Sequence, residues 1–111
     1  QRHLEGVGAG GAPVAVQGLE HTSEFAEVIL RNTRTRMDTD LIEAEVLDAA
    51  RRLKRDTPEI RSVVLECTDL PPYANRIQED LKLPVFDLTT LAQMAHNASA
   101  RTGYCGLMPW S

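Results

Sequence analysis

Apolar and polar positions along the chain form blocks that predict helices separated by short strands. The clearest helix is predicted over residues 38–56, DTDLIEAEVLDAARRLKRD, where apolar residues recur at helical spacing. These residues share one face: Ile42, Val46, Ala49, Ala50 and Leu53. Asp40 followed by Glu43 fits a capping box at the start of this helix. Pro58 cannot continue the pattern, so we expect the helix to end before it.

Short apolar runs predict the strands. Residues 60–67, IRSVVLEC, hold a continuous run that is typical of a strand covered on both faces, as in a parallel sheet. Residues 84–87, PVFD, predict a second strand. Residues 13–19, PVAVQGL, predict a third, because β-branched residues there lie between Pro and Gly.

Three more helices complete the pattern. Residues 24–32 follow Ser23 as a cap, residues 70–83 enter through two prolines, and residues 88–101 follow Asp87 as a cap. In the second of them the apolar stripe comprises Ala74, Ile77 and Leu81. Gly103 is expected to end the last one. Strands that alternate with helices predict an α/β fold, with a small parallel sheet and flanking helices.

Composition and charge narrow the possible partners. The chain has 111 residues and a net charge of −4, without a basic stripe, which argues against nucleic acid or an anionic membrane as partner. No apolar run approaches the roughly 18 residues of a membrane span, and the first residues lack the apolar region of a secretory signal. Cys67 and Cys105 form no metal-ligand pattern with histidine, so we expect no metal site and free thiols in the cytoplasm.

The segment around Cys67 carries the candidate chemistry. Cys67 ends a predicted strand, and a predicted helix start follows it within a few residues. Ligands of open α/β sheets bind at the carboxyl ends of strands, and helix starts favour anions. Thr68 adds a hydroxyl, so this segment suits a substrate carboxylate held beside a thiol that moves a proton. The alternative is that Cys67 is a small apolar residue that fills the core, as buried cysteines often do.

Residues 63–94, VVLECTDLPPYANRIQEDLKLPVFDLTTLAQM, resemble the C-terminal half of the aspartate/glutamate/hydantoin racemase superfamily. That superfamily also includes maleate isomerases and arylmalonate decarboxylases. The run LECTDLPP looks like the segment of the second catalytic cysteine, and LKLPVFD looks like the strand after it. With the segments upstream, the resemblance covers residues 1–101. It implies that residues 1–101 are one half of a two-domain racemase-like fold. The apolar composition of the tail, residues 102–111, separately predicts that the tail docks on another surface.

The resemblance implies a racemase or isomerase that moves a proton at the carbon next to a carboxylate and needs no cofactor. Cys67 would be the acid and base, and Thr68 would bind the carboxylate of a small substrate. Asp69 stands where glutamate racemases carry histidine, so it would bind substrate, relay a proton or act as a helix-entry residue.

The resemblance also implies a missing part. The cysteine of the first domain and the first strand of the second domain have no match in the chain, and Cys105 lies in a tail without a strand-to-helix context. We therefore expect the chain to be inactive alone and to pair with the missing N-terminal half or with a second subunit, as in a homo-oligomer. Two alternatives stay open: a related decarboxylase or lyase with a single cysteine, and a non-catalytic domain that binds a metabolite.

Overall fold

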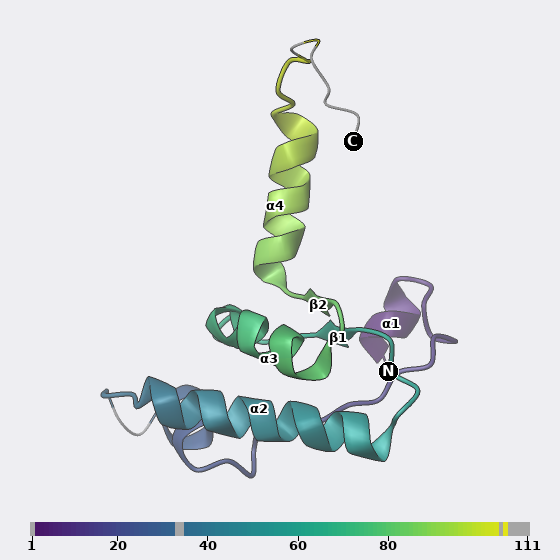
Figure 1. Cartoon of the computed structure of the whole chain (residues 1–111). Helices are drawn as coiled ribbons and strands as arrows, with labels where there is room; N and C mark the ends of the chain where they lie inside the picture. The colour runs from purple at the N-terminus through teal and green to yellow at the C-terminus, as the bar shows by residue number, and fades with distance from the viewer. Residues whose placement is uncertain (1, 33–34, 105, 107–111) are drawn as a thin grey trace.

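A computed structural model describes residues 2–32, 35–104 and 106. The elements along the chain are α1 (Arg2–Gly6), the π-helix η1 (Ala26–Leu30), α2 (Thr39–Asp56), β1 (Val63–Val64), the 3-10 helix η2 (Pro71–Tyr73), α3 (Ala74–Leu81), β2 (Val85–Phe86) and α4 (Leu88–Ser99) (Figure 1). Helices and two parallel strands therefore form a small α/β domain, as the alternating pattern predicted.

The sheet has two parallel strands joined by a helical crossover. Val63 lies opposite Val85, and Val64 lies opposite Phe86. The amide of Val63 donates to the carbonyl of Pro84 at 2.9 Å, and the amide of Leu65 donates to that of Phe86 at 2.8 Å. Parallel strands need such a crossover, which η2 and α3 provide. The carboxyl ends of both strands consequently lie at one edge of the sheet.

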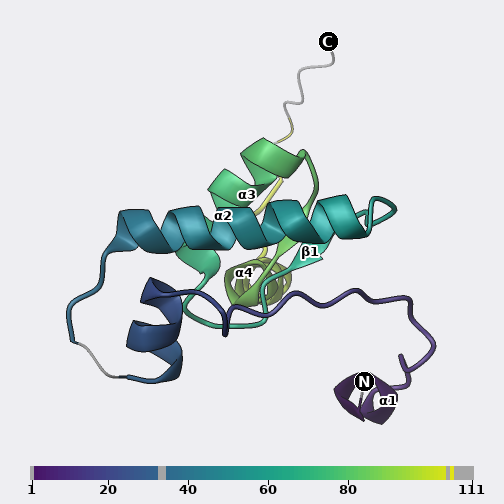
Figure 2. The ribbon, with the colours of Figure 1, turned by 90° about the horizontal axis from the view of Figure 1, so that it is seen from below.

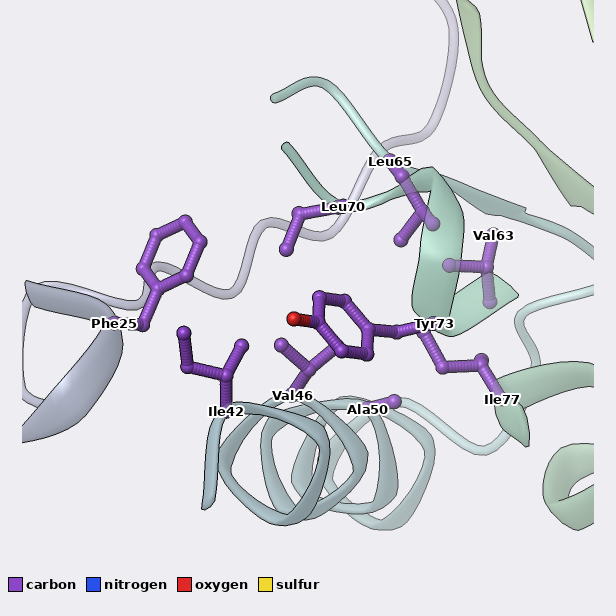
Figure 3. Packing of buried hydrophobic residues seen from close by; sticks show 9 residues of the cluster. All are labelled: Phe25, Ile42, Val46, Ala50, Val63, Leu65, Leu70, Tyr73 and Ile77. Atoms are coloured by element: carbon purple, nitrogen blue, oxygen red, sulfur yellow. The ribbon is translucent and has the colours of Figure 1, made fainter. Parts of the chain in front are cut away.

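The hydrophobic core lies between α2, α3, η2 and the sheet. Helix α3 packs against both α2 and β2, so it joins the long helix to the strands (Figures 1 and 2). The buried cluster comprises Phe25, Ile42, Val46, Ala50, Val63, Leu65, Leu70, Tyr73 and Ile77 (Figure 3). The stripe predicted for α3 is confirmed, because Ile77 is 1% exposed and Ala74 and Leu81 pack against the cluster.

Among the described residues, only one face of the sheet is covered. Val63 and Leu65 are buried, whereas Val64 is 72% exposed and its neighbour Phe86 is 51% exposed. The expectation of a strand covered on both faces is therefore wrong. Helix α4 projects away from the sheet and buries none of its residues (Figure 1). The Cα radius of gyration is 17.5 Å, compared with about 13 Å for a compact chain of this size.

The N-terminal third departs most from the predicted elements. Residues 13–19 form no strand, because no strand lies beside them and Val16 is 87% exposed. An extended segment needs a hydrogen-bonded neighbour to become part of a sheet. The helix predicted over residues 24–32 begins as an α-helical turn and continues as the π-helix η1.

The helix boundaries follow local capping chemistry. Asp38, not Asp40, caps α2 by accepting the amide of Leu41 at 3.0 Å. Helix α2 ends at Asp56, before Pro58, as predicted. Asp87 caps α4 as predicted, in a capping box with Thr90. Helix α4 stops at Ser99, so Gly103 does not end it.

Cys105 and most of the predicted tail, residues 107–111, lie outside the described residues. The described part of the chain contains no helix that combines the length and the apolar character needed to cross a bilayer.

Candidate functional site

Cys67 lies on a tight turn that follows β1. The amide of Leu70 donates to the carbonyl of Cys67 at 3.2 Å and closes this turn. The Cys67 side chain is half-buried against the hydrophobic cluster, while Thr68 and Asp69 are exposed at the corner of the turn. Strand β1 ends at Val64, so the prediction that Cys67 is the last residue of the strand is wrong; Cys67 lies between β1 and η2, after the carboxyl end of the parallel strand. Cys67 is a free thiol.

The thiol of Cys67 is hydrogen-bonded to its neighbour Asp69. The Sγ atom lies 3.6 Å from Oδ2 of Asp69, and the thiol is the donor. This hydrogen bond fixes the direction of the thiol, and a cysteine acts as a base or a nucleophile in its thiolate form. The turn therefore brings Cys67, Thr68 and Asp69 together.

The helix start beyond the turn offers fewer hydrogen-bond donors than its position suggests. Pro71 and Pro72 have no backbone N–H. The amide of Tyr73 donates to Leu70, and the amide of Ala74 donates to Pro71. The donors that stay available are on the turn itself. Within the described part of the chain, the amides of residues 67–69 and the hydroxyl of Thr68 form no hydrogen bond.

A hollow of about 310 Å³ opens beside the turn. Its lining comes from four segments of the chain and comprises Phe25, Ile29, Met37, Thr39, Ile42, Thr68, Asp69, Pro72 and Tyr73. Figure 3 shows Phe25, Ile42 and Tyr73 close together, with the Tyr73 hydroxyl on the side of Phe25 and Ile42. The hollow thus has an apolar floor, and Thr68 and Asp69 lie at its edge. Cys67 does not line it and is linked to it through Asp69.

Negative charge surrounds the Tyr73 side of the hollow. Burial raises the pKa of the Tyr73 hydroxyl, and the nearby charges of Glu43 and Asp69 raise that pKa further. Glu43 is paired with Arg76 at 3.4 Å, whereas the carboxylate of Asp69 receives the thiol of Cys67. The carboxylate of Asp69, which lines the hollow, attracts a positively charged group.

A metal site has no support among the described residues. No three side chains of His, Cys, Asp or Glu cluster there as metal ligands do. His3, His21 and His96 are exposed on separate parts of the chain.

Sequence reasoning missed the residues that form the hollow. Phe25, Ile29 and Met37 are distant in sequence from Thr68, and they reach the turn only because η1 and the start of α2 pack beside η2. Tyr73 is 7% exposed, packs in the hydrophobic cluster and also lines the hollow.

Comparisons with known proteins point to one kind of enzyme. The chain is 49% identical over 51 residues to dimethylsulfoniopropionate lyase 5 of Emiliania huxleyi (strain CCMP1516), covering 46% of this chain and 9% of that protein. It is 24% identical over 74 residues to dimethylsulfoniopropionate lyase of Durusdinium sp. clade D, covering 67% of this chain and 25% of the relative. Dimethylsulfoniopropionate lyase 7 of Emiliania huxleyi is 36% identical over 59 residues, which are 50% of this chain and 17% of that protein.

The chain spans a quarter or less of the length of these curated relatives. No protein-family model matches it, and no solved structure matches it significantly.

These names correct the function predicted from the sequence. The relatives are lyases, so the assignment to the racemase superfamily, the racemase activity and the isomerase class are wrong. The LECTDLPP run led to the wrong reaction because it is not specific for racemases. A cysteine and a threonine after a strand suit any reaction that needs a base beside a carboxylate. The alternative of a lyase agrees with the names of the relatives.

Proposed function

We propose that this chain carries part of the active site of a lyase that cleaves dimethylsulfoniopropionate or a similar sulfonium carboxylate. The observation that carries the proposal is the pairing of the Cys67 thiol with the Asp69 carboxylate at 3.6 Å, on a turn with unused hydrogen-bond donors. The names of the relatives supply the substrate and the type of reaction.

The substrate has a carboxylate at one end and a dimethylsulfonium group at the other. A lyase cleaves it by elimination, without water as a reactant. In its thiolate form, Cys67 removes a proton from the carbon next to the carboxylate and becomes a thiol, which donates its hydrogen bond to Asp69. The electron pair of that C–H bond forms the C=C bond, and the C–S bond breaks with its electrons on sulfur. The products are dimethyl sulfide and acrylate.

Thr68 and the backbone amides of the turn are proposed to hold the substrate carboxylate. The hydroxyl of Thr68 and the amides of residues 67–69 are exposed or near the surface, with no other hydrogen-bond partner in the described part of the chain. Proton removal places extra negative charge on the carboxylate oxygens in the transition state. Donors fixed by the backbone stabilise that charge without having to reorganise.

The elimination needs one base rather than two. A racemase needs an acid on the opposite face of the carbon, whereas an elimination is complete when the leaving group departs. A single cysteine on this turn is therefore sufficient for the proton transfer. The remaining walls of the active site are proposed to come from further chain, since the relatives are at least four times as long as the region that matches.

The proposal is tested by alkylation of Cys67 with iodoacetamide in a Cys105→Ala background. We expect dimethylsulfoniopropionate and propionate to slow the alkylation, because both place a carboxylate at Thr68, next to the thiol. A Thr68→Val variant should lose this protection, and a Thr102→Val variant, which changes a threonine outside the site, should keep it. Release of dimethyl sulfide into the gas above the solution is assayed with a longer protein that contains this chain and the proposed remaining walls, and Cys67→Ala in that protein is the control.

Alkylation at the same rate with and without both carboxylates would refute the proposed carboxylate site. Release of dimethyl sulfide that survives in Cys67→Ala would refute the assignment of the base.

A further inference from the structure

We propose that the hollow beside the turn is a binding site for a methylated cation, a sulfonium or a quaternary ammonium group. This inference rests on the proposed function in one respect, because it assigns the cationic end of the substrate to this hollow. The carboxylate end is assigned to Thr68 and the turn amides.

The lining has the composition that methylated cations require. Phe25 and Tyr73 supply aromatic rings, and Ile29, Met37 and Ile42 supply aliphatic surface. Of the described residues that line the hollow, only Asp69 is charged, and it is negative. Aromatic rings attract cations through their electron-rich faces, and a nearby carboxylate adds a direct attraction.

The hollow suits a methylated cation better than a primary ammonium group. An ammonium group carries three N–H donors that each need an acceptor when water is excluded. Five of the nine lining residues are apolar, and the side-chain acceptors are the Asp69 carboxylate and the hydroxyls of Thr39, Thr68 and Tyr73. A sulfonium or quaternary ammonium group has no N–H donor, so apolar walls and one negative charge are sufficient. The volume of about 310 Å³ lies at the small end of the range for ligand pockets.

The position of Asp69 joins the hollow to the proposed base. Its carboxylate lines the hollow and also receives the Cys67 thiol. A substrate with its cation in the hollow and its carboxylate at Thr68 would therefore pass close to the thiol. Asp69 would attract the cationic end of the substrate into the hollow.

The test uses the whole chain and the trimethylsulfonium ion as the probe. Amide chemical shifts of the chain, labelled with ¹⁵N, are followed during titration. Tert-butyl alcohol, a neutral molecule of similar shape, is the control ligand. We expect trimethylsulfonium to shift the amides of Phe25, Ile29 and Tyr73 and to bind roughly tenfold more tightly than tert-butyl alcohol, as cation–π and carboxylate attraction predict.

Two sets of variants identify the cause of binding. Asp69→Asn should weaken trimethylsulfonium binding roughly tenfold, and the matched Asp48→Asn variant on the outer face of α2 should not. Met37 is exposed at the edge of the hollow, so it accepts polar substitutions. Met37→Lys should abolish binding of the cation by like-charge repulsion, whereas the neutral Met37→Gln should retain most of it.

Equal affinity for trimethylsulfonium and tert-butyl alcohol, or unchanged affinity in both Asp69→Asn and Met37→Lys, would overturn the inference. Its failure is distinguishable from failure of the proposed function. Protection of Cys67 by propionate reports the carboxylate site alone, because propionate has no cation. Trimethylsulfonium binding reports the hollow alone, because that ion has no carboxylate.

Discussion

The carboxylate of Glu45 on α2 accepts the backbone N–H of Phe25 at 2.9 Å, although 20 residues separate them in the chain. The same carboxylate accepts the amides of Ser23 and Glu24, at 3.1 and 2.7 Å. A side chain of α2 thus satisfies the first N–H groups of the helical segment that leads into η1. This arrangement holds Phe25 in the core and, with it, one wall of the hollow.

Replacing Glu45 with Gln should lower the free energy of unfolding by about 1–3 kcal/mol, the range for hydrogen bonds to charged groups. The glutamine amide keeps one acceptor oxygen and turns an NH₂ group toward amides that are themselves donors. The measurement is urea unfolding at pH 7. Glu43→Gln is the matched control, because Glu43 makes only an exposed pair with Arg76, and its effect should be within about 0.5 kcal/mol.

Stability should fall in acid partly through Glu45. Burial would raise its pKa, but the hydrogen bonds from Phe25, Glu24 and Ser23 outweigh burial and lower the pKa. A carboxyl group with a lower pKa in the folded state stabilises that state above the pKa of the unfolded chain, about 4.3. This stabilisation is lost as the pH falls through the lower pKa of the folded state. Urea unfolding between pH 7 and pH 3 should therefore show a shallower acid decline in Glu45→Gln. Parallel curves for the two proteins would contradict this.

A further prediction concerns the hydrophobic core, where Ile77 is 1% exposed and lies between α2, Tyr73 and the sheet (Figure 3). Ile77→Ala should cost about 2–5 kcal/mol, and Ile77→Val about 0.5–1.5 kcal/mol, because a larger cavity loses more contacts. Leu91→Ala on the exposed side of α4 should change stability by less than about 0.5 kcal/mol. Similar losses for Ile77→Ala and Leu91→Ala would show that α3 is not the centre of the core.

Helix α4 should depend on its cap more than on tertiary packing. Asp87 accepts the Thr89 hydroxyl and the Thr90 amide, which lower its pKa, and α4 buries none of its residues. Asp87→Ala should cost the helix about 1 kcal/mol and reduce the helical circular dichroism signal, while the unfolding transition of the core hardly moves. Ser99→Ala at the other end of α4 is the control and should leave the signal unchanged. A matching loss of core stability in Asp87→Ala would contradict this independence.

The sequence predicted the helices and caps whose formation depends on residues close together in the chain. The 3.6-residue period of α2, the proline entry to α3 and the cap at Asp87 each act within one or two turns, so the sequence alone indicates them. Asp38 and Asp40 are both good caps two positions apart, and the pattern could not choose between them. The run at residues 13–19 has the composition of a strand but no neighbour to pair with.

The sequence alone predicted only part of the candidate site. Cys67, Thr68 and Asp69 are adjacent, so their proximity was predictable, and the structure adds the hydrogen bond between the thiol and the carboxylate. The hollow was not predictable, because Phe25 and Met37 meet the turn through packing between segments about 30–45 residues apart. The reaction was misassigned for a different reason. A base beside a carboxylate serves both racemisation and elimination, and the leaving group belongs to the substrate.

The uncovered face of the sheet has a thermodynamic consequence. Val64 and Phe86 on this face, and Leu88, Leu91 and Met94 on the exposed helix α4, already contact water in the folded chain. Unfolding therefore hydrates less new apolar surface than in a compact domain, and the heat capacity of unfolding per residue should lie below the usual value of about 12–15 cal/mol/K. A small heat capacity change makes the curve of stability against temperature flat. The chain should thus lose stability only slowly on cooling. Any molecule that covers this face would increase the heat capacity change of unfolding and make the stability curve more strongly curved.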